Sequence, residues 1–260
     1  MSSSVKVVGV DVGSLNTKVV ILDDGEVLHR HMTSRAGKGE VIAQMAIAEA
    51  LADCNLAEDH IGSIILTSHI RMKAGFAHSM KNFLVCLARG SVALVPDVKT
   101  IIDVGAENVS VVSLDSSGKI RDYARNDKCA AGSGVFLEAM AKMMGLTMED
   151  MISLAMKAEK GVPIASTCTV FAEQEVLSTV FEADPPSRME ILAGVHDALA
   201  SRVVGLTMNV GIKPPILLCG GVANNRAFVK SMNNQIDGGV LVPEYPQFVA
   251  ALGAGLHIEG

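Results

Sequence analysis

The feature of the sequence that most constrains the fold is a repeated segment, an apolar run that ends in Asp-Val-Gly. It occurs at residues 7–14 and again at residues 100–106. In both copies a second apolar run follows, at 18–22 and 109–114, and ends at a turn that contains Asp and Gly. A short strand candidate comes after each turn. Asp-Gly turns also join strands in proteins without repeats, but the shared order predicts a duplicated α/β fold.

After each group of strands the apolar spacing becomes helical. Residues 40–52 carry apolar side chains at helical spacing, and a buried strand is expected at 64–66. In the second half, Ser187 and Glu190 form a possible capping box that opens a helix ending near Gly211. Further elements are expected as a strand at 216–219, a helix at 225–234, a strand at 240–242 and a helix at 247–257. Together they predict an N-terminal lobe at 1–97 and a C-terminal lobe at 98–260.

The composition excludes several classes of protein. In 260 residues, apolar side chains make up 49% and charged side chains 19%, which is typical of a compact globular chain. A net charge of −6 without a basic stripe argues against nucleic-acid binding. Because no signal peptide or membrane-spanning run is recognisable, we expect a cytoplasmic protein without membrane contact. The five cysteines are then expected to be thiols or metal ligands rather than disulfides.

The two Asp-Val-Gly loops suggest a nucleotide site. Glycine lets backbone N–H groups approach a phosphate closely, and a carboxylate can hold hydrated Mg²⁺ or orient a water molecule. Asp11 and Gly13 supply one such set in the first lobe, and Asp103 and Gly105 supply another in the second. Further donors in the first loop are Ser14, Asn16, Thr17 and Lys18.

A third pair of glycines, Gly220 and Gly221, follows a buried strand and is suited to adenosine. The chain has no P-loop, which would need Gly-x-x-x-x-Gly-Lys-Ser/Thr. Three loops in this order resemble those of the superfamily of acetate kinases, sugar kinases, heat-shock chaperones and actin. The resemblance implies two ribonuclease H-like lobes, an actin-like ATPase fold, with ATP and Mg²⁺ in a nucleotide cleft between them.

Two cysteines lie at positions suited to ligands. Cys168 lies near the start of an expected helix, where the helix dipole favours a thiolate, and Cys129 precedes a helical run at 135–144. A cubane cluster takes four thiolates, so two cysteines per chain would require a two-fold dimer. The ordinary alternative is a pair of small buried residues, and the spacing alone favours it. The same ordinary interpretation is given to Cys54, Cys86 and Cys219.

The segments around the two cysteines change that preference. Residues 126–134 read Asn-Asp-Lys-Cys-Ala-Ala-Gly-Ser-Gly, and residues 166–173 read Ser-Thr-Cys-Thr-Val-Phe-Ala-Glu. They resemble the signature of activators of 2-hydroxyacyl-CoA dehydratases and of the ATP-binding subunits of benzoyl-CoA reductases. Three further motifs resemble those of the same proteins. They are Val-Asp-Val-Gly-Ser near the start, Gly-Gly-Val-Ala-Asn at 220–224 and Ala-Leu-Gly-Ala-Gly at 251–255. The resemblance therefore covers essentially the full length.

This resemblance implies roles for individual residues. Cys129 and Cys168 would be the ligands of one [4Fe–4S] cluster shared between two subunits. Asp11 would hold Mg²⁺ through water, and Asp103 would orient the attacking water. The nucleotide site would be lined by Gly13, Ser14, Asn16, Thr17, Lys18, Gly105, Ala106, Glu107, Gly220, Gly221 and Asn224.

Proteins of this kind couple ATP to low-potential electron transfer. The donor would be a ferredoxin or flavodoxin, and the acceptor a partner acyl-CoA dehydratase or reductase. Closure of the lobes on ATP would rotate the helices that start near Cys129 and Cys168. A homodimer is favoured, and a heterodimer stays open because benzoyl-CoA reductase pairs two unlike ATPase subunits.

The second loop departs from the usual family pattern Asp-Ile-Gly-Gly-Gln-Asp. Ala106 adds a methyl group where bare backbone would approach phosphate, and Asn108 lacks a carboxylate. Ser110 stands near the usual place of a lysine. The Gly-Thr-Gly-like stretch after the third strand is reduced to Ala-Gly-Lys-Gly at 36–39. We expect these changes to affect the rate of ATP hydrolysis more than the binding of the cluster.

Two other classes of function stay open, a small-molecule kinase of the same fold and an ATP-binding assembly protein that polymerises. Both would lack iron. The candidate histidines His69, His78 and His196 show no metal-ligand spacing, so surface or core roles are favoured. Core filling is also the expectation for Met140, Met143 and Met144.

Overall fold

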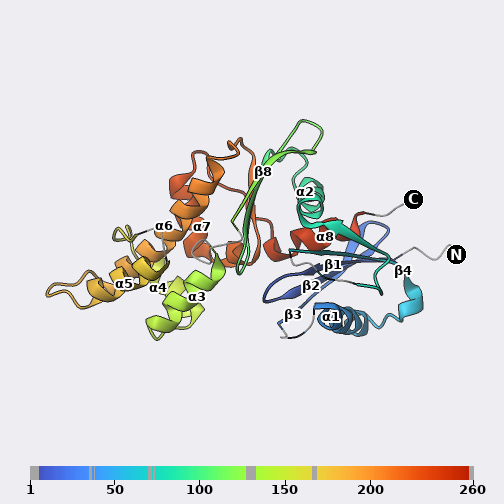
Figure 1. Ribbon diagram of the computed structural model, residues 1–260, viewed down its shortest axis with the longest axis horizontal. Helices are drawn as coiled ribbons and strands as arrows, with labels where there is room; N and C mark the ends of the chain where they lie inside the picture. Colours follow the sequence, from blue (N-terminus) through green and yellow to red (C-terminus); the bar gives the residue numbers. More distant parts are fainter. Residues whose placement is uncertain are drawn as a thin grey trace. The chain divides into compact units, whose positions relative to one another are not determined.

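The computed structural model describes residues 6–34, 37, 39–69, 72, 74–126, 133–165 and 169–257. The chain divides into two compact units. The first unit comprises residues 1–98, 114–120 and 244–260, and the second comprises residues 99–113 and 121–243. Figure 1 labels the helices and strands. None of the described helices is both long and apolar enough to cross a membrane.

The sheet of the first unit has the strand order β3-β2-β1-β4-β5. β1 pairs antiparallel with β2 and parallel with β4, and α1 lies in the crossover to β4. The elements up to this point are β1 (Lys6–Val12), β2 (Thr17–Asp23), β3 (Glu26–Thr33), α1 (Gly39–Asp53), a 3₁₀ turn η1 (Glu58–His60), β4 (Ile61–Ser68) and β5 (Ser79–Asn82).

Strand β1 is buried on both faces because helices cover both sides of the sheet. Val8, Val10 and Val12 belong to one apolar cluster with α1. Val7 belongs to another cluster with α2 (Phe83–Leu94) and α8 (Val249–Gly255). This alternation follows from the two-residue period of a strand, and it explains why the sequence of β1 is a nearly continuous apolar run.

Glycines allow α2, α8 and β1 to pack very closely, and Figure 1 shows α8 beside both partners. A Cβ atom at Gly9 would lie 2.1 Å from the Ala251 carbonyl oxygen. One at Gly253 would lie 1.7 Å from the Cys86 carbonyl oxygen. Both separations are far too short for any side chain, so the Ala-Leu-Gly-Ala-Gly motif at 251–255 has a packing role.

The sheet of the second unit has the order β8-β7-β6-β9, which matches the order β3-β2-β1-β4 of the first. β6 pairs antiparallel with β7 and parallel with β9, as β1 does with β2 and β4. The strands are β6 (Thr100–Val104), β7 (Val109–Leu114), β8 (Ile120–Asn126) and β9 (Ile216–Cys219). The match confirms the predicted duplication and the α/β class.

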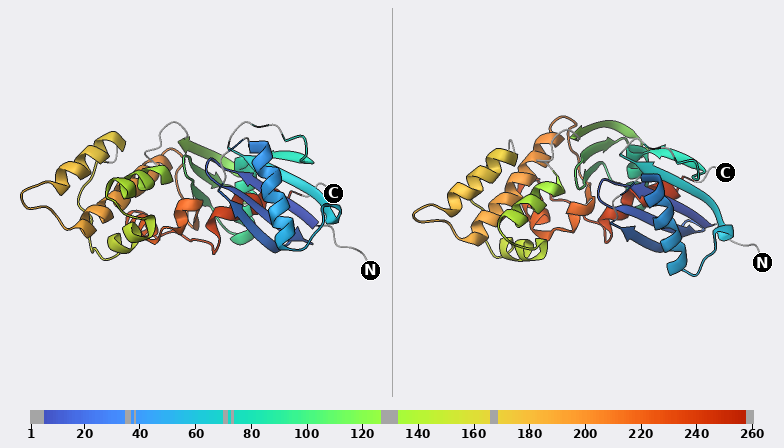
Figure 2. Two further views of the ribbon diagram at one scale, coloured as in Figure 1. Left: turned by 90° about the horizontal axis from the view of Figure 1, so that it is seen from below. Right: turned by 60° about the horizontal axis from the view of Figure 1, so that its bottom comes forward.

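The helices of the second unit share one apolar core with β6, β7 and β9. They are α3 (Gly134–Met143), α4 (Met148–Ala155), α5 (Thr169–Val180), α6 (Arg188–Thr207) and α7 (Arg226–Gln235). The predicted capping box opens α6: Glu190 N donates to Ser187 Oγ at 3.3 Å, and Ser187 N donates to Glu190 Oε2 at 2.9 Å. Figure 2 shows α5 and α6 side by side.

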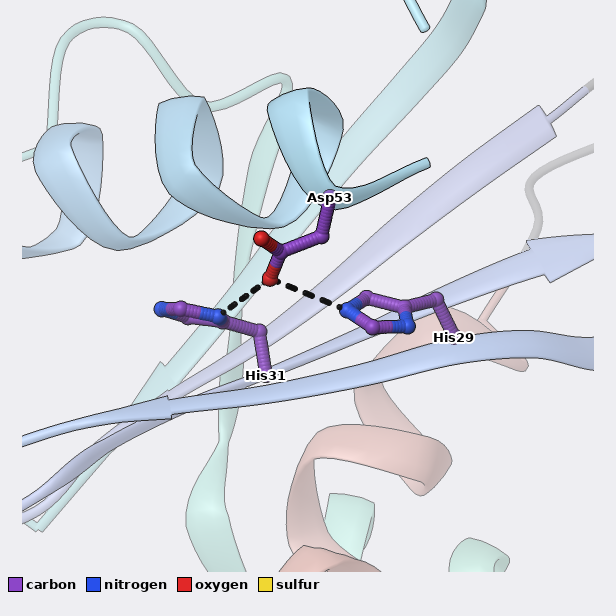
Figure 3. A group of neighbouring side chains, drawn as sticks. All are labelled: His29, His31 and Asp53. Atoms are coloured by element: carbon purple, nitrogen blue, oxygen red, sulfur yellow. Dashed lines mark hydrogen bonds and ion pairs between the residues drawn. The ribbon is translucent and has the colours of Figure 1, made fainter. Parts of the chain in front are cut away.

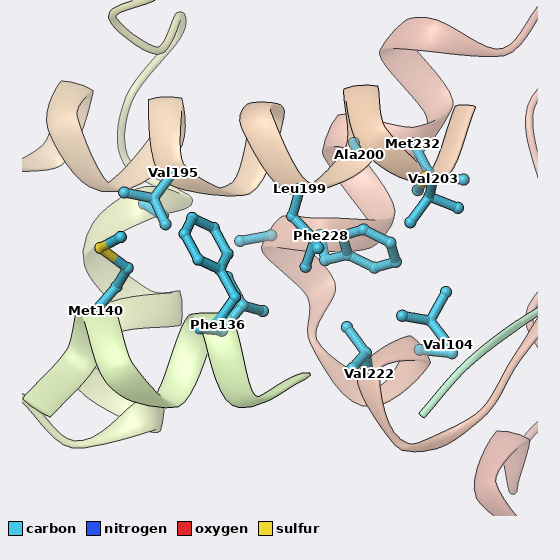
Figure 4. Packing of buried hydrophobic residues seen from close by; sticks show 14 of the residues in the cluster. Val104, Phe136, Met140, Val195, Leu199, Ala200, Val203, Val222, Phe228 and Met232 are labelled. Atoms are coloured by element: carbon cyan, nitrogen blue, oxygen red, sulfur yellow. The ribbon is translucent and has the colours of Figure 1, made fainter. Parts of the chain in front are cut away.

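The apolar core of the second unit lies between these helices and the sheet. Phe136 of α3, Leu199 of α6 and Phe228 of α7 meet there with Val104 of β6 (Figure 4). Met140 is fully buried in the same core. Met143 and Met144 are partly buried against it, so all three methionines fill the core as predicted.

Some predictions from the sequence differ from the structure. The predicted strand at 240–242 is wrong, because only one bridge forms there, between Leu217 and Leu241. The final helix is shorter than predicted and follows a 3₁₀ turn, η4 (Pro246–Phe248). Residues 244–260, expected in the C-terminal lobe, cluster with the first unit because α8 packs on β1 and α2. Residues 114–120 also join it, since Gly118 lies against Val92 of α2.

Candidate nucleotide-binding site

The first Asp-Gly loop joins β1 to β2 and holds a buried carboxylate. Asp11 lies opposite Lys18 in the β1–β2 ladder and is only 4% exposed. Lys18 Nζ donates to Asp11 Oδ2 at 3.1 Å, while Asp11 Oδ1 is buried without a hydrogen-bond partner in the described part of the chain. A buried charged oxygen of this kind is costly unless a cation or donor meets it. The carboxylate therefore fits a hydrated Mg²⁺ ion.

Gly13 is needed at the tip of this loop. Its N–H donates to the Asn16 carbonyl oxygen at 3.1 Å, and a Cβ atom would lie 2.7 Å from Lys18 Nζ. Ser34 Oγ donates to Asn16 Oδ1 and so fixes that side chain. Ser14 is half-buried, whereas Thr17 is buried as the first residue of β2. Thr17 thus supports the loop from inside the unit.

The second Asp-Gly loop, between β6 and β7, repeats this backbone geometry. The Gly105 N–H donates to the Asn108 carbonyl oxygen at 2.8 Å, as Gly13 does to Asn16 in the first loop. Asp103 is 6% exposed, Ala106 is half-buried and Glu107 is exposed. The two loops are structural equivalents, as the repeat in the sequence predicts.

The neighbours of the two aspartates differ. Asp11 lies opposite Lys18, whereas Asp103 lies opposite Ser110 on one side and Cys219 on the other. Ser110 Oγ is buried without a hydrogen-bond partner among the described residues, and Cys219 Sγ donates to Asp103 Oδ1 at 3.8 Å. Burial, together with the charge of Asp103, raises the pKa of the Cys219 thiol well above its ordinary value. Beside the second carboxylate the Ser110 hydroxyl thus stands where the first has the Lys18 ammonium group, and the Cys219 thiol stands where the first has Thr67.

The second loop is hydrogen-bonded to the start of α3. The Gly134 N–H donates to the Gly105 carbonyl oxygen at 3.0 Å, and the Val135 N–H donates to the Ala106 carbonyl oxygen at 2.9 Å. The first N–H groups of a helix have no partner within the helix, and here the loop supplies two. A displacement of this loop would therefore move the first turn of α3.

The two glycines after β9 have different roles. Gly220 has a φ of 87°, and a Cβ atom there would lie 2.4 Å from the Val104 carbonyl oxygen. Gly220 is therefore required by backbone conformation and by the packing of β9 on β6. A Cβ atom at Gly221 would meet nothing within 4 Å. Gly221 begins η3 (Gly221–Asn224), where Asn224 Nδ2 donates to its carbonyl oxygen at 3.1 Å, and it suits close approach of a ligand better than Gly220 does.

The predicted cluster ligands, Cys129 and Cys168, lie outside the described residues. The helices that follow them in the chain are described, and α3 begins at Gly134 and α5 at Thr169. The other cysteines are reduced in the structure. Cys86 and Cys219 are fully buried, and burial raises the pKa of Cys86 to about 11. Cys54 lies in the turn after α1 and is half-buried rather than fully buried.

The candidate histidines have structural roles. His196 is 1% exposed, and its Nδ1 donates to the Leu192 carbonyl oxygen at 2.7 Å while its Nε2 accepts from Asn225 Nδ2 at 3.0 Å. Burial lowers the pKa of His196, so the ring is held neutral. His78 Nδ1 accepts from the Ile64 N–H at 3.0 Å, and the ring of His69 packs on Phe83.

Two other histidines were missed. His29 and His31 lie on β3 beside Asp53 at the end of α1 (Figure 3). Their His-x-His spacing was visible in the sequence and places both rings on one face of a strand. The carboxylate of Asp53 lies 22 residues after His31 in the sequence. Only the fold therefore reveals that the three side chains form one group.

Comparisons with other proteins extend over nearly the whole chain. Residues 8–257 match the BadF/BadG/BcrA/BcrD ATPase family. The activator of lactoyl-CoA dehydratase from Anaerotignum propionicum is 37% identical over 249 residues, which are 96% of this chain and 95% of that protein. The activator of the 2-hydroxyisocaproyl-CoA dehydratase from Clostridium difficile, solved with bound ADPNP, has a TM-score of 0.90 at 35% identity and covers 97% of this chain and 93% of that one.

A more distant structure supports the fold alone. A ROK family glucokinase from Streptomyces griseus has a TM-score of 0.56 at 13% identity, over 96% of this chain and 98% of that one. Likeness to a sugar kinase agrees with the predicted fold. The family match over residues 8–257 and relatives above 30% identity over almost the full length lead to one conclusion: the chain belongs to the BadF/BadG/BcrA/BcrD ATPase family.

Proposed function

We propose that this chain is the ATPase that activates a 2-hydroxyacyl-CoA dehydratase, by ATP-dependent electron transfer through a [4Fe–4S] cluster shared between two subunits. The two relatives described above are named as activators of dehydratases that act on CoA compounds, and both are similar to the chain over almost all its length. They serve dehydratases of different acyl-CoA compounds, so the organic substrate belongs to the partner enzyme. A ferredoxin or flavodoxin is the proposed electron donor.

The nucleotide chemistry of this proposal depends on charge and position. Asp11 Oδ1, buried and without a hydrogen-bond partner among the described residues, would bind the water shell of Mg²⁺, and Lys18 holds the other carboxylate oxygen in place. Asp103 would orient the attacking water. Mg²⁺, when bound, neutralises phosphate charge. In phosphoryl transfer, catalysis comes mainly from positioning the reactants and stabilising charge, not from covalent chemistry by the protein. Residues that only position charge are therefore sufficient for ATP hydrolysis.

One observation carries the link between ATP and the cysteines, namely the hydrogen bonds from α3 to the second loop. A phosphate that contacts residues 105–106 would shift the carbonyl groups that accept from Gly134 and Val135. These two residues begin the helix that directly follows the segment of Cys129. ATP and ADP would then favour different positions of this helix start, because the two nucleotides contact the loop differently.

The surface of α5 supports a second subunit. Val170 is 66% exposed, Phe171 is 63% exposed and Phe181, just after the helix, is 82% exposed. Several large apolar side chains exposed together are typical of interaction surfaces. Val170 and Phe171 come two and three residues after Cys168 in the chain, so a two-fold contact along the start of α5 would bring the cysteine segments of both subunits together.

The donor set agrees with the proposed cluster. Two chains with Cys129 and Cys168 offer the four thiolates that a cubane cluster takes. When bound, such a cluster supplies a one-electron carrier of low potential. Cys86 and Cys219 are unsuitable ligands because they are buried and held as thiols.

The test compares single cysteine variants prepared without oxygen. Cys129→Ala and Cys168→Ala are expected to lose the iron and the activation of a purified 2-hydroxyacyl-CoA dehydratase while they retain ATP binding. Cys54→Ala is the matched control, since Cys54 is half-buried in a turn, and it should retain about two iron atoms per chain, or four per dimer. Full iron content in Cys129→Ala would contradict the ligand assignment.

The same preparation separates the alternatives. A small-molecule kinase or a polymerising ATPase would contain no iron in the wild-type protein. A subunit of the benzoyl-CoA reductase type would contain iron but would activate only when paired with a second, unlike ATPase chain. Activation of the dehydratase by the homodimer alone therefore supports the proposal. If the homodimer has its full iron content but does not activate the dehydratase, the reductase type is favoured.

A further inference from the structure

The group formed by His29, His31, Glu49 and Asp53 lies on the face of the first sheet that α1 covers. His31 Nδ1 is 2.9 Å from Asp53 Oδ2, and His29 Nε2 is 3.3 Å from the same oxygen. The second ring nitrogen of His31, Nε2, is 3.1 Å from Glu49 Oε2. Figure 3 shows both imidazoles turned toward the Asp53 carboxylate from opposite sides.

Regular secondary structure assembles this group. His29 and His31 are two residues apart on β3, so their side chains point to the same face. Glu49 and Asp53 are four residues apart on α1, so they lie on one side of that helix. The group is thus held on a strand and a helix, which position ligands more rigidly than loops do.

A neutral His31 cannot donate to both of its carboxylate neighbours. A neutral imidazole carries one N–H, and both nitrogens of His31 face carboxylate oxygens. If Nε2 donates to Glu49, the lone pair of Nδ1 points at the acceptor Asp53 Oδ2. A second proton on the ring or a metal ion would turn this repulsion into attraction.

We propose that His29 Nε2, His31 Nδ1 and an Asp53 carboxylate oxygen bind one divalent transition-metal ion of the Zn²⁺ type. Ligand atoms of a tetrahedral zinc site with bonds of 2.0–2.1 Å lie about 3.3 Å apart. Here the two contacts with Asp53 Oδ2 are 2.9 and 3.3 Å long, and all three ligand atoms lie within 4.8 Å of one another. Three protein ligands leave a fourth position for water. The proposed ligands lie on β3 and α1, outside the two Asp-Val-Gly loops.

Glu49 completes the arrangement as a positioning residue. A histidine that binds a metal through one nitrogen usually donates its other N–H to a carboxylate, which orients the ring and makes it a stronger ligand. His31 has that carboxylate in Glu49 at 3.1 Å.

The experiment titrates Zn²⁺ into the cluster-loaded protein under anaerobic conditions, with heat of binding and retained iron as readouts. The wild-type protein should bind one Zn²⁺ per chain. His31→Asn and Asp53→Asn should lose this binding, and Glu49→Gln should weaken it about 10- to 100-fold. His60→Asn, which changes an exposed histidine of the same unit, should bind as the wild type does.

Co²⁺ gives a second readout that identifies the ligands. Bound to nitrogen and oxygen, it should show visible ligand-field bands without the strong near-ultraviolet band of cobalt–thiolate bonds. The ligand-field bands should be absent from His31→Asn. Equal binding by wild type and His31→Asn, or no binding by the wild type, would overturn the proposal and leave a proton as the cation between His31 and Asp53. Circular dichroism verifies that each variant is folded.

Discussion

At the scale of single residues, Asp11 is the group on which nucleotide chemistry most depends. Its Oδ1 is buried without a hydrogen-bond partner among the described residues, and its Oδ2 is paired with Lys18. Asp11→Asn should lower the rate of ATP hydrolysis by about 100-fold or more, a typical loss when one group that stabilises developing charge is removed. Steady-state release of phosphate measures this rate.

Asp23→Asn is the matched control for Asp11→Asn. Asp23 also pairs with a lysine across the β1–β2 ladder, with Lys6 Nζ at 3.2 Å from Asp23 Oδ2, but at the other end of the strands. Its variant should hydrolyse ATP within about two-fold of the wild-type rate, because Asp23 lies at the end of β2 away from the loop that joins β1 to β2. Similar rates for the two variants would exclude a special role for Asp11.

His196 makes a prediction about pH. Burial lowers its pKa in the folded state below the unfolded value of about 6.5, so the unfolded chain binds more protons in that range. Stability should therefore be complete above about pH 6.5 and fall as the pH decreases. Urea unfolding at pH 7 and pH 5 measures this loss of stability, which should be smaller in His196→Gln than in the wild type. At pH 7 the substitution itself lowers the free energy of unfolding by about 1–3 kcal/mol, because buried hydrogen bonds are lost. Equal losses would contradict this assignment.

At the scale of elements, the contact between α2 and α8 depends on glycine. A Cβ atom at Gly253 would lie 1.7 Å from the backbone oxygen of Cys86, so Gly253→Ala must push the two helices apart. Overpacking of this kind costs about 1–3 kcal/mol or more, and the melting temperature should fall by several degrees. A melting curve followed by circular dichroism measures it.

Gly205→Ala is the matched helical control. Gly205 lies inside α6, where a Cβ atom would meet nothing within 4 Å. Alanine favours helix by about 0.5–1 kcal/mol over glycine, so this variant should be as stable as the wild type or more so. If Gly253→Ala behaved in the same way, close packing of α8 would not be the reason for the glycine.

At the scale of the whole molecule, the proposed cluster should hold two chains together. Anaerobic removal of iron with a chelator should raise the dissociation constant of the dimer at least ten-fold, because four thiolate bonds across the two-fold axis are lost. Native mass spectrometry of the iron-loaded and iron-free protein measures the change. Asp11→Asn, which alters only the nucleotide loop, should remain dimeric when loaded with iron. An unchanged dissociation constant without iron would show that protein surfaces alone hold the dimer.

The sequence by itself determined the features that depend on neighbouring residues. The repeated apolar runs and Asp-Val-Gly turns predicted both sheets, since strand alternation and turns are local. The capping box at Ser187 was predicted for the same reason. The strand at 240–242 was predicted wrongly, because a short apolar run forms a strand only where a partner offers a full ladder, and here it meets β9 through one bridge.

Only the tertiary structure decided which distant residues meet. It joined residues 244–260 to the first unit through the packing of α8. It separated the roles of Gly220 and Gly221, and it brought Asp53 between His29 and His31. All of these features depend on segments that are far apart in the chain and meet in the fold. The burial of many apolar side chains fixes these contacts together, so no local sequence pattern predicts them.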